Sequence, residues 1–185
     1  MSVGSFDGPV RFPAVWPRAL GRRDAGAVTG VDPLRPLLEA ALKGDDVAVA
    51  ELVRRTQPDV WRLCVALGSQ GEVEDLVQDT YLRALGSLDR YRGEAPVRSW
   101  LLSIARNVCA DHVRRRERQR RLLDRVRARR DDLVAPAPGV DDLLDHLDGD
   151  RRDAFVLTQL LGLSYEEAAA AMDCPIGTIR SRVAR

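Results

Sequence analysis

Residues 96–116 limit the fold more than any other stretch, because their apolar side chains recur at helical spacing. Residues at i, i+3, i+4 and i+7 share one side of an α-helix, whereas a strand needs a period of two. The apolar side is formed by Leu101, Ile104, Ala105, Val108 and Cys109, and the opposite side by Ser103, Arg106, Asn107, Ala110 and Arg114. The pattern predicts an amphipathic helix. Its polar face carries guanidinium groups, which suit phosphates, and a carboxamide, which pairs with a base edge.

The residues before this helix predict further helices and no strand. Apolar residues at 34–42 keep a spacing of three or four up to Lys43-Gly44, where glycine is expected to end a helix. Asp45 or Asp46 is placed to cap the next helix. Pro58 is placed to open a third one at its first turn, with Gly68 closing it. We therefore expect an all-α fold, with a helical bundle over 33–116.

Charge is distributed unevenly, although the net charge is only +1. Residues 113–130 hold ten Arg and two acidic residues, whereas residues 131–153 hold eight Asp. These blocks indicate a change of environment, and the Pro/Gly-rich residues 134–139 indicate a linker. The Arg-rich part either extends the preceding helix or stays mobile. We expect a flexible extension over 1–32, one helical domain over 33–116, a flexible basic linker over 117–140 and a second small helical domain over 141–185.

No pattern indicates a catalytic or metal site. Cys64, Cys109 and Cys174 lie far apart without a CxxC spacing, so buried reduced thiols are favoured over a disulfide or a metal site. No nucleophile–base pair, carboxylate dyad or phosphate loop is visible, so we expect no enzyme, no metal and no cofactor. No stretch reaches the roughly 18 apolar residues of a membrane span, which predicts a cytoplasmic protein without membrane insertion.

Residues 71–88 predict a helix with an unusual outer face. Its buried side is apolar, while the far side carries Asp75, Gln78, Asp79 and Leu82 at i, i+3, i+4 and i+7. Two interpretations are open. Leu82 anchors a basic partner helix with the acids as a rim, or it packs inside the bundle while the acids balance Arg83 and the helix dipole.

The loop 89–96 combines an aromatic ring with cations. Tyr91 lies between Arg90 and Arg92, and this combination suits an unpaired base and its backbone. A stacked base contributes about 1–3 kcal/mol on such a ring. Trp100 borders the buried face of the next helix, so a core position is favoured over a base-stacking one.

The last segment, 141–185, is typical of a helix-turn-helix. Leu143, Leu144 and Leu147 start a short helix, and a second one ends at Gly162. Ser164 and Glu167 have the spacing of a capping box for the third helix. A recognition helix follows Pro175, with Ile179 and Val183 buried. Its exposed residues, which suit phosphates and guanine, are Thr178, Arg180, Ser181, Arg182 and Arg185.

Two segments carry a family resemblance. EVEDLVQDTYLRAL (72–85) and RYRGEAPVRSWLLSIARNVCADHVRRR (90–116) resemble region 2 of the extracytoplasmic-function (ECF, group IV) subfamily of sigma-70 transcription initiation factors. GLSYEEAAAAMDCPIGTIRSRVAR (162–185) resembles region 4 of the same subfamily. The resemblance implies a four-helix region 2 and a helix-turn-helix region 4 on a tether. It also implies three partners: core RNA polymerase, through its clamp helices and flap, promoter DNA, and an anti-sigma factor.

The resemblance also implies residue roles. Asp75, Gln78, Asp79 and Leu82 would contact polymerase, and Tyr91, Asn107, Arg114 and Arg115 would lie at the −10 strand. Thr178, Arg180, Ser181, Arg182 and Arg185 would face the −35 element. The family usually continues the final helix for two or three more turns and often has a larger residue where Ala184 stands, so the strength of the −35 contact is an open question.

Two other functions remain as alternatives. A self-sufficient helix-turn-helix regulator would need a dimerisation helix or ligand domain, and neither is visible in the sequence. An adaptor whose acidic helix binds another basic coiled coil is compatible with residues 71–88 alone.

Overall fold

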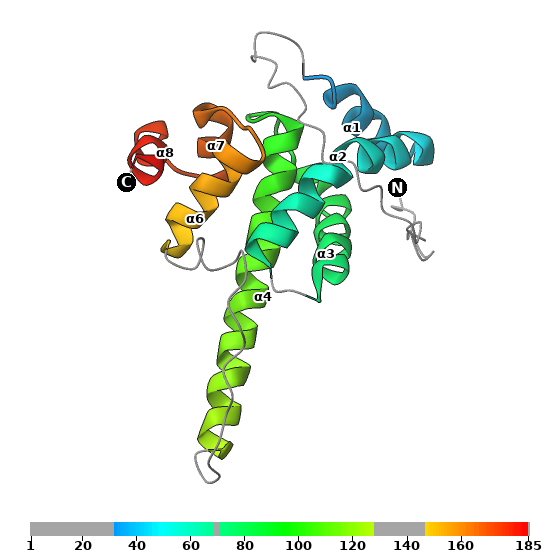
Figure 1. Ribbon diagram of the computed structural model, residues 1–185. Helices are drawn as coiled ribbons and strands as arrows, with labels where there is room; N and C mark the ends of the chain where they lie inside the picture. The colour runs from blue at the N-terminus through cyan, green and yellow to red at the C-terminus, as the bar shows by residue number, and fades with distance from the viewer. Residues whose placement is uncertain (1–31, 69–70, 128–146, 185) are drawn as a thin grey trace.

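The computed structural model describes residues 32–68, 71–127 and 147–184, with side chains up to residue 123 in the longest helix. All regular elements in these ranges are helical, which confirms the all-α prediction. Helices α1 to α4 form one bundle, and α6 to α8 form a smaller unit beside it (Figure 1). In chain order the elements are α1 (Arg35–Leu42), α2 (Asp46–Leu67), α3 (Val73–Leu85), the 3-10 turn η1 (Leu88–Arg90), α4 (Val97–Arg127), α6 (Gly149–Phe155), the π-helical turn η2 (Val156–Leu160), α7 (Tyr165–Met172) and α8 (Ile176–Val183).

Several helix ends follow the predicted capping chemistry. Gly44 follows α1 with a φ of 85°, a conformation in which a side chain would be strained. Asp45 caps α2, because its carboxylate accepts hydrogen bonds from the amides of Val47 and Ala48. Ser164 and Glu167 form the predicted capping box at α7. The local sequence therefore sets where these helices begin and end.

The predicted helix start at Pro58 is wrong. Residues Asp46–Leu67 form one helix with Pro58 in its interior. Pro58 has no amide hydrogen for the carbonyl of Arg54, a loss that normally breaks a helix. Here Thr56 and Val60 on either side are buried against the bundle. Packing of the flanking turns outweighs the local cost.

Helix α4 is longer than the domain boundary predicted for it. It continues past residue 116 to Arg127, so the first part of the expected flexible linker is helical. Up to residue 127, the Arg-rich segment therefore extends the preceding helix, which was one of the two alternatives. The predicted extension 1–32, except for Asp32, and the remaining linker lie outside the described residues, as do Leu143, Leu144 and Arg185.

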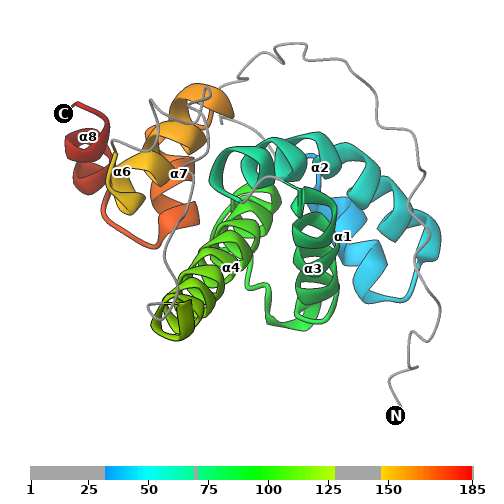
Figure 2. The ribbon, with the colours of Figure 1, turned by 60° about the horizontal axis from the view of Figure 1, so that its bottom comes forward.

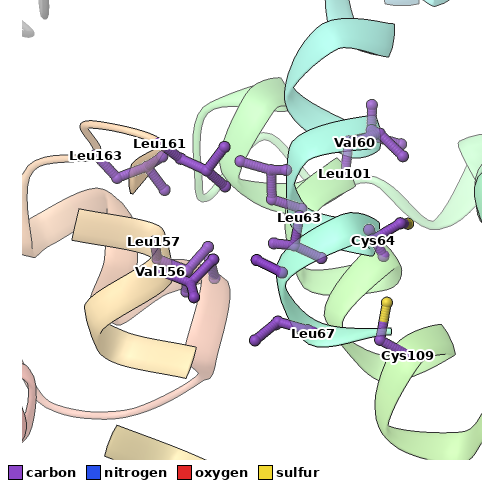
Figure 3. Packing of buried hydrophobic residues seen from close by; sticks show 14 of the residues in the cluster. Val60, Leu63, Cys64, Leu67, Leu101, Cys109, Val156, Leu157, Leu161 and Leu163 are labelled. Atoms are coloured by element: carbon purple, nitrogen blue, oxygen red, sulfur yellow. The ribbon is translucent and has the colours of Figure 1, made fainter. Parts of the chain in front are cut away.

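One hydrophobic core joins the two helical units. Leu63 and Leu67 of α2 and Leu101 of α4 pack with Val156 and Leu157 from η2 (Figure 3). Leu157 is fully buried, although the unit that contains it is small. Figure 2 shows the α6–α8 unit lying beside one end of α4 rather than apart from the bundle. Burial of these side chains provides the main driving force for that arrangement.

A second core cluster lies at the other end of the bundle. Leu38 of α1, Leu88 of η1 and Val97 of α4 are buried there. The amide of Val97 donates a hydrogen bond to a carboxylate oxygen of Asp32 at 2.7 Å, which helps to fix the start of α4. Trp100 packs against both clusters, as predicted for a core tryptophan.

Candidate polymerase and promoter interfaces

Helix α3 presents the predicted acidic face to solvent. Its opposite side is buried through Leu76, Val77, Thr80, Tyr81 and Ala84. Asp75 and Gln78 are exposed, and the side chain of Leu82 is 59% exposed. Packing of Leu82 inside the bundle is therefore wrong. The same interpretation also held that the acids balance Arg83. This applies to Asp79, which pairs with Arg83 at 3.0 Å.

Arg83 connects this helix to α4. Its guanidinium group lies 3.1 Å from Asp111 on α4 as well as beside Asp79. The hydrogen bond with Asp111 is the main reason why the pKa of Arg83 is raised. Both acids are partly exposed, so these pairs add little stability but fix the position of the cation.

Asn107 lies in a hollow between α3 and α4. Gly86, Ser87 and Arg90 line it from the end of α3 and from η1, and Arg83 and Ile104 complete it. The hollow is open to solvent and has a volume of about 410 Å³. The residues that line it carry a carboxamide, a hydroxyl and two guanidinium groups, which is a suitable set for a base with its phosphate. Sequence reasoning found Asn107 but not Ser87 or Arg83, because helical spacing does not reveal which residues of α3 approach α4.

Tyr91 occupies a different environment from Asn107. Its hydroxyl donates a hydrogen bond to the carbonyl oxygen of Ala95 at 2.6 Å, and its ring centroid lies 5.3 Å from that of Trp100. The ring is half-buried against the second core cluster, and burial raises the pKa of its phenol. Tyr91 therefore shapes the loop before α4 and offers only part of its surface to a ligand.

Arg114 and Arg115 are both exposed on α4, beyond the hollow. The Nε of Arg114 donates a hydrogen bond to the carbonyl oxygen of Ala110 at 3.2 Å, and its Nη2 lies 3.6 Å from Asp111. Both cations are accessible to a phosphate. Asn107, Arg114 and Arg115 thus share one helix, whereas Tyr91 stands in the loop at its other end.

Helices α7 and α8 form the predicted helix-turn-helix. The turn contains Asp173 in a left-handed conformation with a φ of 49°. Ile179 is fully buried, while Arg180 and Ser181 are exposed on the outer side of α8. Thr178 is half-buried, and its carbonyl accepts a hydrogen bond from the hydroxyl of Ser181 at 2.9 Å. The outer face of α8 therefore offers a short polar surface.

Arg182 is already engaged by a carboxylate. It pairs with Asp150 of α6, and its Nη1 lies 3.7 Å from the sulfur of Cys174. Asp150 also lies 3.5 Å from Arg106 of α4, so it stands between a cation of each helical unit. Asp153 pairs with the same Arg106. Burial raises the pKa of Asp153, although Arg106 lowers it.

Two further arginines join the α6–α8 unit to the bundle. Arg98 donates hydrogen bonds to Asp59 at 2.8 Å and to the carbonyl of Leu161 at 2.9 Å. Arg152 donates to the carbonyl of Ala66 at 2.7 Å. Each of these three bonds spans a long separation in the sequence, so none was visible in local patterns.

Cys64 and Cys109 are buried in the main core, as predicted, and Cys174 is half-buried. A hydrogen bond with Cys64, together with burial, raises the pKa of the Cys109 thiol. Among the described residues, no group of three or more His, Cys, Asp or Glu could hold a metal ion. None of the helices in the described ranges is both long and apolar enough to cross a membrane.

Comparison with known families assigns both helical units. Residues 52–119 match Sigma-70 region 2, and residues 139–185 match Sigma-70, region 4. The chain is also 45% identical over 157 residues to a probable RNA polymerase sigma-C factor from Mycobacterium bovis, covering 79% of this chain and 83% of the relative. The chain belongs to the sigma-70 family. The resemblance noted in the sequence is thereby confirmed.

Other relatives of this sigma factor place it in the ECF subfamily. An ECF RNA polymerase sigma-E factor from Escherichia coli K12 is 32% identical over 167 residues, covering 80% of this chain and 87% of the relative. Two solved structures share the fold. CnrH in complex with the cytosolic domain of CnrY has a TM-score of 0.64 at 30% identity, over 82% of this chain and 90% of that one. The sigma factor RpoE in complex with the anti-sigma factor NepR from Bartonella quintana has a TM-score of 0.61 at 32% identity, over 74% and 90% of the two chains.

Proposed function

We propose that this sigma factor binds core RNA polymerase and directs it to promoters through three separate surfaces, without catalysis of its own. The polymerase-binding surface is the outer face of α3, with Leu82 as its apolar anchor and Asp75, Gln78 and Asp79 around it. Acidic groups around an exposed leucine complement a basic helix, because the apolar anchor gives affinity and the charges give orientation. This role places the protein in the cytoplasm, where polymerase acts.

The hollow at Asn107 is proposed to hold an unpaired base of the −10 element. The carboxamide of Asn107 pairs with the base edge, while Arg90 neutralises a nearby phosphate. Arg83 must release Asp79 or Asp111 before it takes part. Arg114 and Arg115 continue the phosphate contacts along α4. Tyr91 acts chiefly by positioning the loop before α4, because its hydroxyl bonds to Ala95 and its ring packs on Trp100.

Helix α8 is proposed to enter the major groove of the −35 element. Arg180 and Ser181 face solvent and need no rearrangement for this role, and Thr178 lies next to them. Arg182 must first release its ion pair with Asp150 before it can contact DNA. Arg185 is assigned to the same surface by its position in the sequence. An anti-sigma factor is a further proposed partner, because the solved RpoE relative is bound to one.

The observation that carries this proposal is the exposed Leu82 among acids on α3. Replacing it with alanine (Leu82→Ala) is expected to weaken binding to core polymerase about tenfold, since a central apolar anchor contributes about 1–2 kcal/mol. Folding should be little affected because the Leu82 side chain is largely exposed. Binding is measured by titrating labelled protein with core enzyme, and function by run-off transcription from promoter fragments.

Leu42→Ala is the matched control, because Leu42 is also an exposed leucine, on α1. It should leave core binding unchanged. An equal loss of affinity for core polymerase in both variants would contradict a docking role for α3. Specific DNA binding by the chain without core enzyme would favour the self-sufficient regulator instead.

A further inference from the structure

The distal part of α4 carries a run of cations that no role described so far uses. Beyond Arg115 the helix holds Arg116, Arg118, Arg120 and Arg121, all exposed. Figure 1 shows this half of α4 extending away from the other helices. In the part of the chain that the structure describes, none of these four arginines forms an ion pair or side-chain hydrogen bond. Unpaired guanidinium groups on a projecting helix are available to an external polyanion.

Helical geometry divides these arginines between two faces. At 3.6 residues per turn, positions separated by 7, 11 and 14 residues lie on the same side of a helix. Counted from Asn107, those positions are Arg114, Arg118 and Arg121. Arg116 and Arg120 fall on the far side. The face that carries the hollow at Asn107 thus continues as a row of three arginines.

We propose that Arg118 and Arg121 bind the phosphate backbone of the promoter duplex next to the −10 element, as a continuation of the Asn107 surface. The inference rests on the proposed function of that surface. The row from Asn107 to Arg121 is about 21 Å long at 1.5 Å per residue. One strand of duplex DNA presents a phosphate about every 3.4 Å, so the row matches roughly six phosphates. These contacts are independent of sequence, because guanidinium–phosphate pairs fix position and do not read bases.

The apolar residues of the segment do not favour a protein partner on this face. Leu122 and Leu123 are 60% and 48% exposed, but they are only two adjacent residues at the end of an arginine-rich stretch. Residues 114–121 hold six Arg and one Glu. This excess of positive charge complements the high charge density of a nucleic acid.

The test uses full-length protein assembled with core polymerase on a promoter fragment. The double variant Arg118→Ala/Arg121→Ala is compared with Arg116→Ala/Arg120→Ala, which removes the same charge from the opposite face. The affinity of the assembled protein–polymerase complex for the promoter fragment is measured at salt concentrations from 50 to 200 mM. Two lost phosphate contacts lower the slope of log affinity against log salt by about 1.8. The wild type should therefore lose about tenfold more affinity over this range than the first variant, while the control variant keeps the wild-type slope.

Several outcomes would overturn the inference. Equal slopes in both double variants would mean that the charge acts without regard to face. An unchanged slope in the first variant would mean that Arg118 and Arg121 do not contact DNA. Weaker binding of the first variant to core polymerase without DNA would assign the arginines to a protein surface. If wild-type protein and core form no promoter complex at all, the proposed function itself fails, and that result is distinct from the other three.

Discussion

A single hydroxyl contact connects two helices in the core of the bundle. The hydroxyl of Tyr81 on α3 lies 2.8 Å from that of Thr56 on α2, and Thr56 also donates to the carbonyl of Leu52 at 2.8 Å. Both side chains are almost completely buried. Both hydroxyls have hydrogen-bond partners, so burying this polar pair in the core costs little free energy.

The ionisation of Tyr81 should make the bundle sensitive to alkaline pH. Burial raises the pKa of Tyr81 above its usual value, more than the hydrogen bond to Thr56 lowers it. The folded protein therefore keeps a proton that the unfolded chain releases near pH 10. Stability from this residue is complete below pH 10 and falls above it, by up to about 1.4 kcal/mol per pH unit.

Tyr81→Phe tests this effect. It should cost about 1 kcal/mol at pH 8, because the bond to Thr56 is lost. The difference from the wild type should shrink, and then reverse, as pH rises above 10. Urea unfolding at a series of pH values measures it, and a constant difference across that series would contradict the assignment.

The helices show how tertiary packing overrides a local signal. Pro58 predicts a helix start, yet it lies inside α2. The missing amide leaves the carbonyl of Arg54 without its normal partner in the helix. Helix α2 nevertheless continues, because buried residues occur along its whole length, from Ala48 to Leu67.

Pro58→Ala should therefore stabilise the protein. Alanine restores the amide donor and removes the clash of the ring with the preceding turn, and Pro58 itself is exposed, so no packing is lost. We expect the free energy of unfolding to rise by about 1–3 kcal/mol, measured by urea titration. No gain would mean that the helix tolerates proline here without strain.

The arrangement of the whole molecule depends on contacts between its two helical units. Leu157 and Leu161 share a core with Leu63 and Leu101, and Arg98 holds both Asp59 and the carbonyl of Leu161. The shared core provides the affinity. The directed hydrogen bonds of Arg98 fix the orientation.

Arg98→Ala should loosen the α6–α8 unit from the bundle. It removes both hydrogen bonds and leaves Asp59 with Arg62 at 3.7 Å. We expect a loss of about 1–3 kcal/mol, seen as faster amide hydrogen exchange in η2 and α7 than in α3. Arg54→Ala is the control, because Arg54 is exposed and pairs with Glu51 of its own helix. Equal exchange in both variants would contradict the role given to Arg98.

Much of this protein could be predicted from sequence order alone. Apolar spacing gave the helical class and the buried faces of α3 and α4, and short polar signals such as Asp45 and Ser164 gave helix starts. These features depend on residues within one or two turns of each other, so the local sequence carries them. The exposed position of Leu82 was one of two open alternatives, because spacing does not reveal whether another helix covers that face.

Only the tertiary structure decided which surfaces meet. Leu157 lies in an apolar stretch of the sequence, but only the fold shows that it packs on α2 and α4 as well as within its own unit. The hollow at Asn107 and the engagement of Arg182 by Asp150 join residues from different helices. Their positions follow from how the helices pack, since side chains far apart in the sequence become neighbours only after the core has formed.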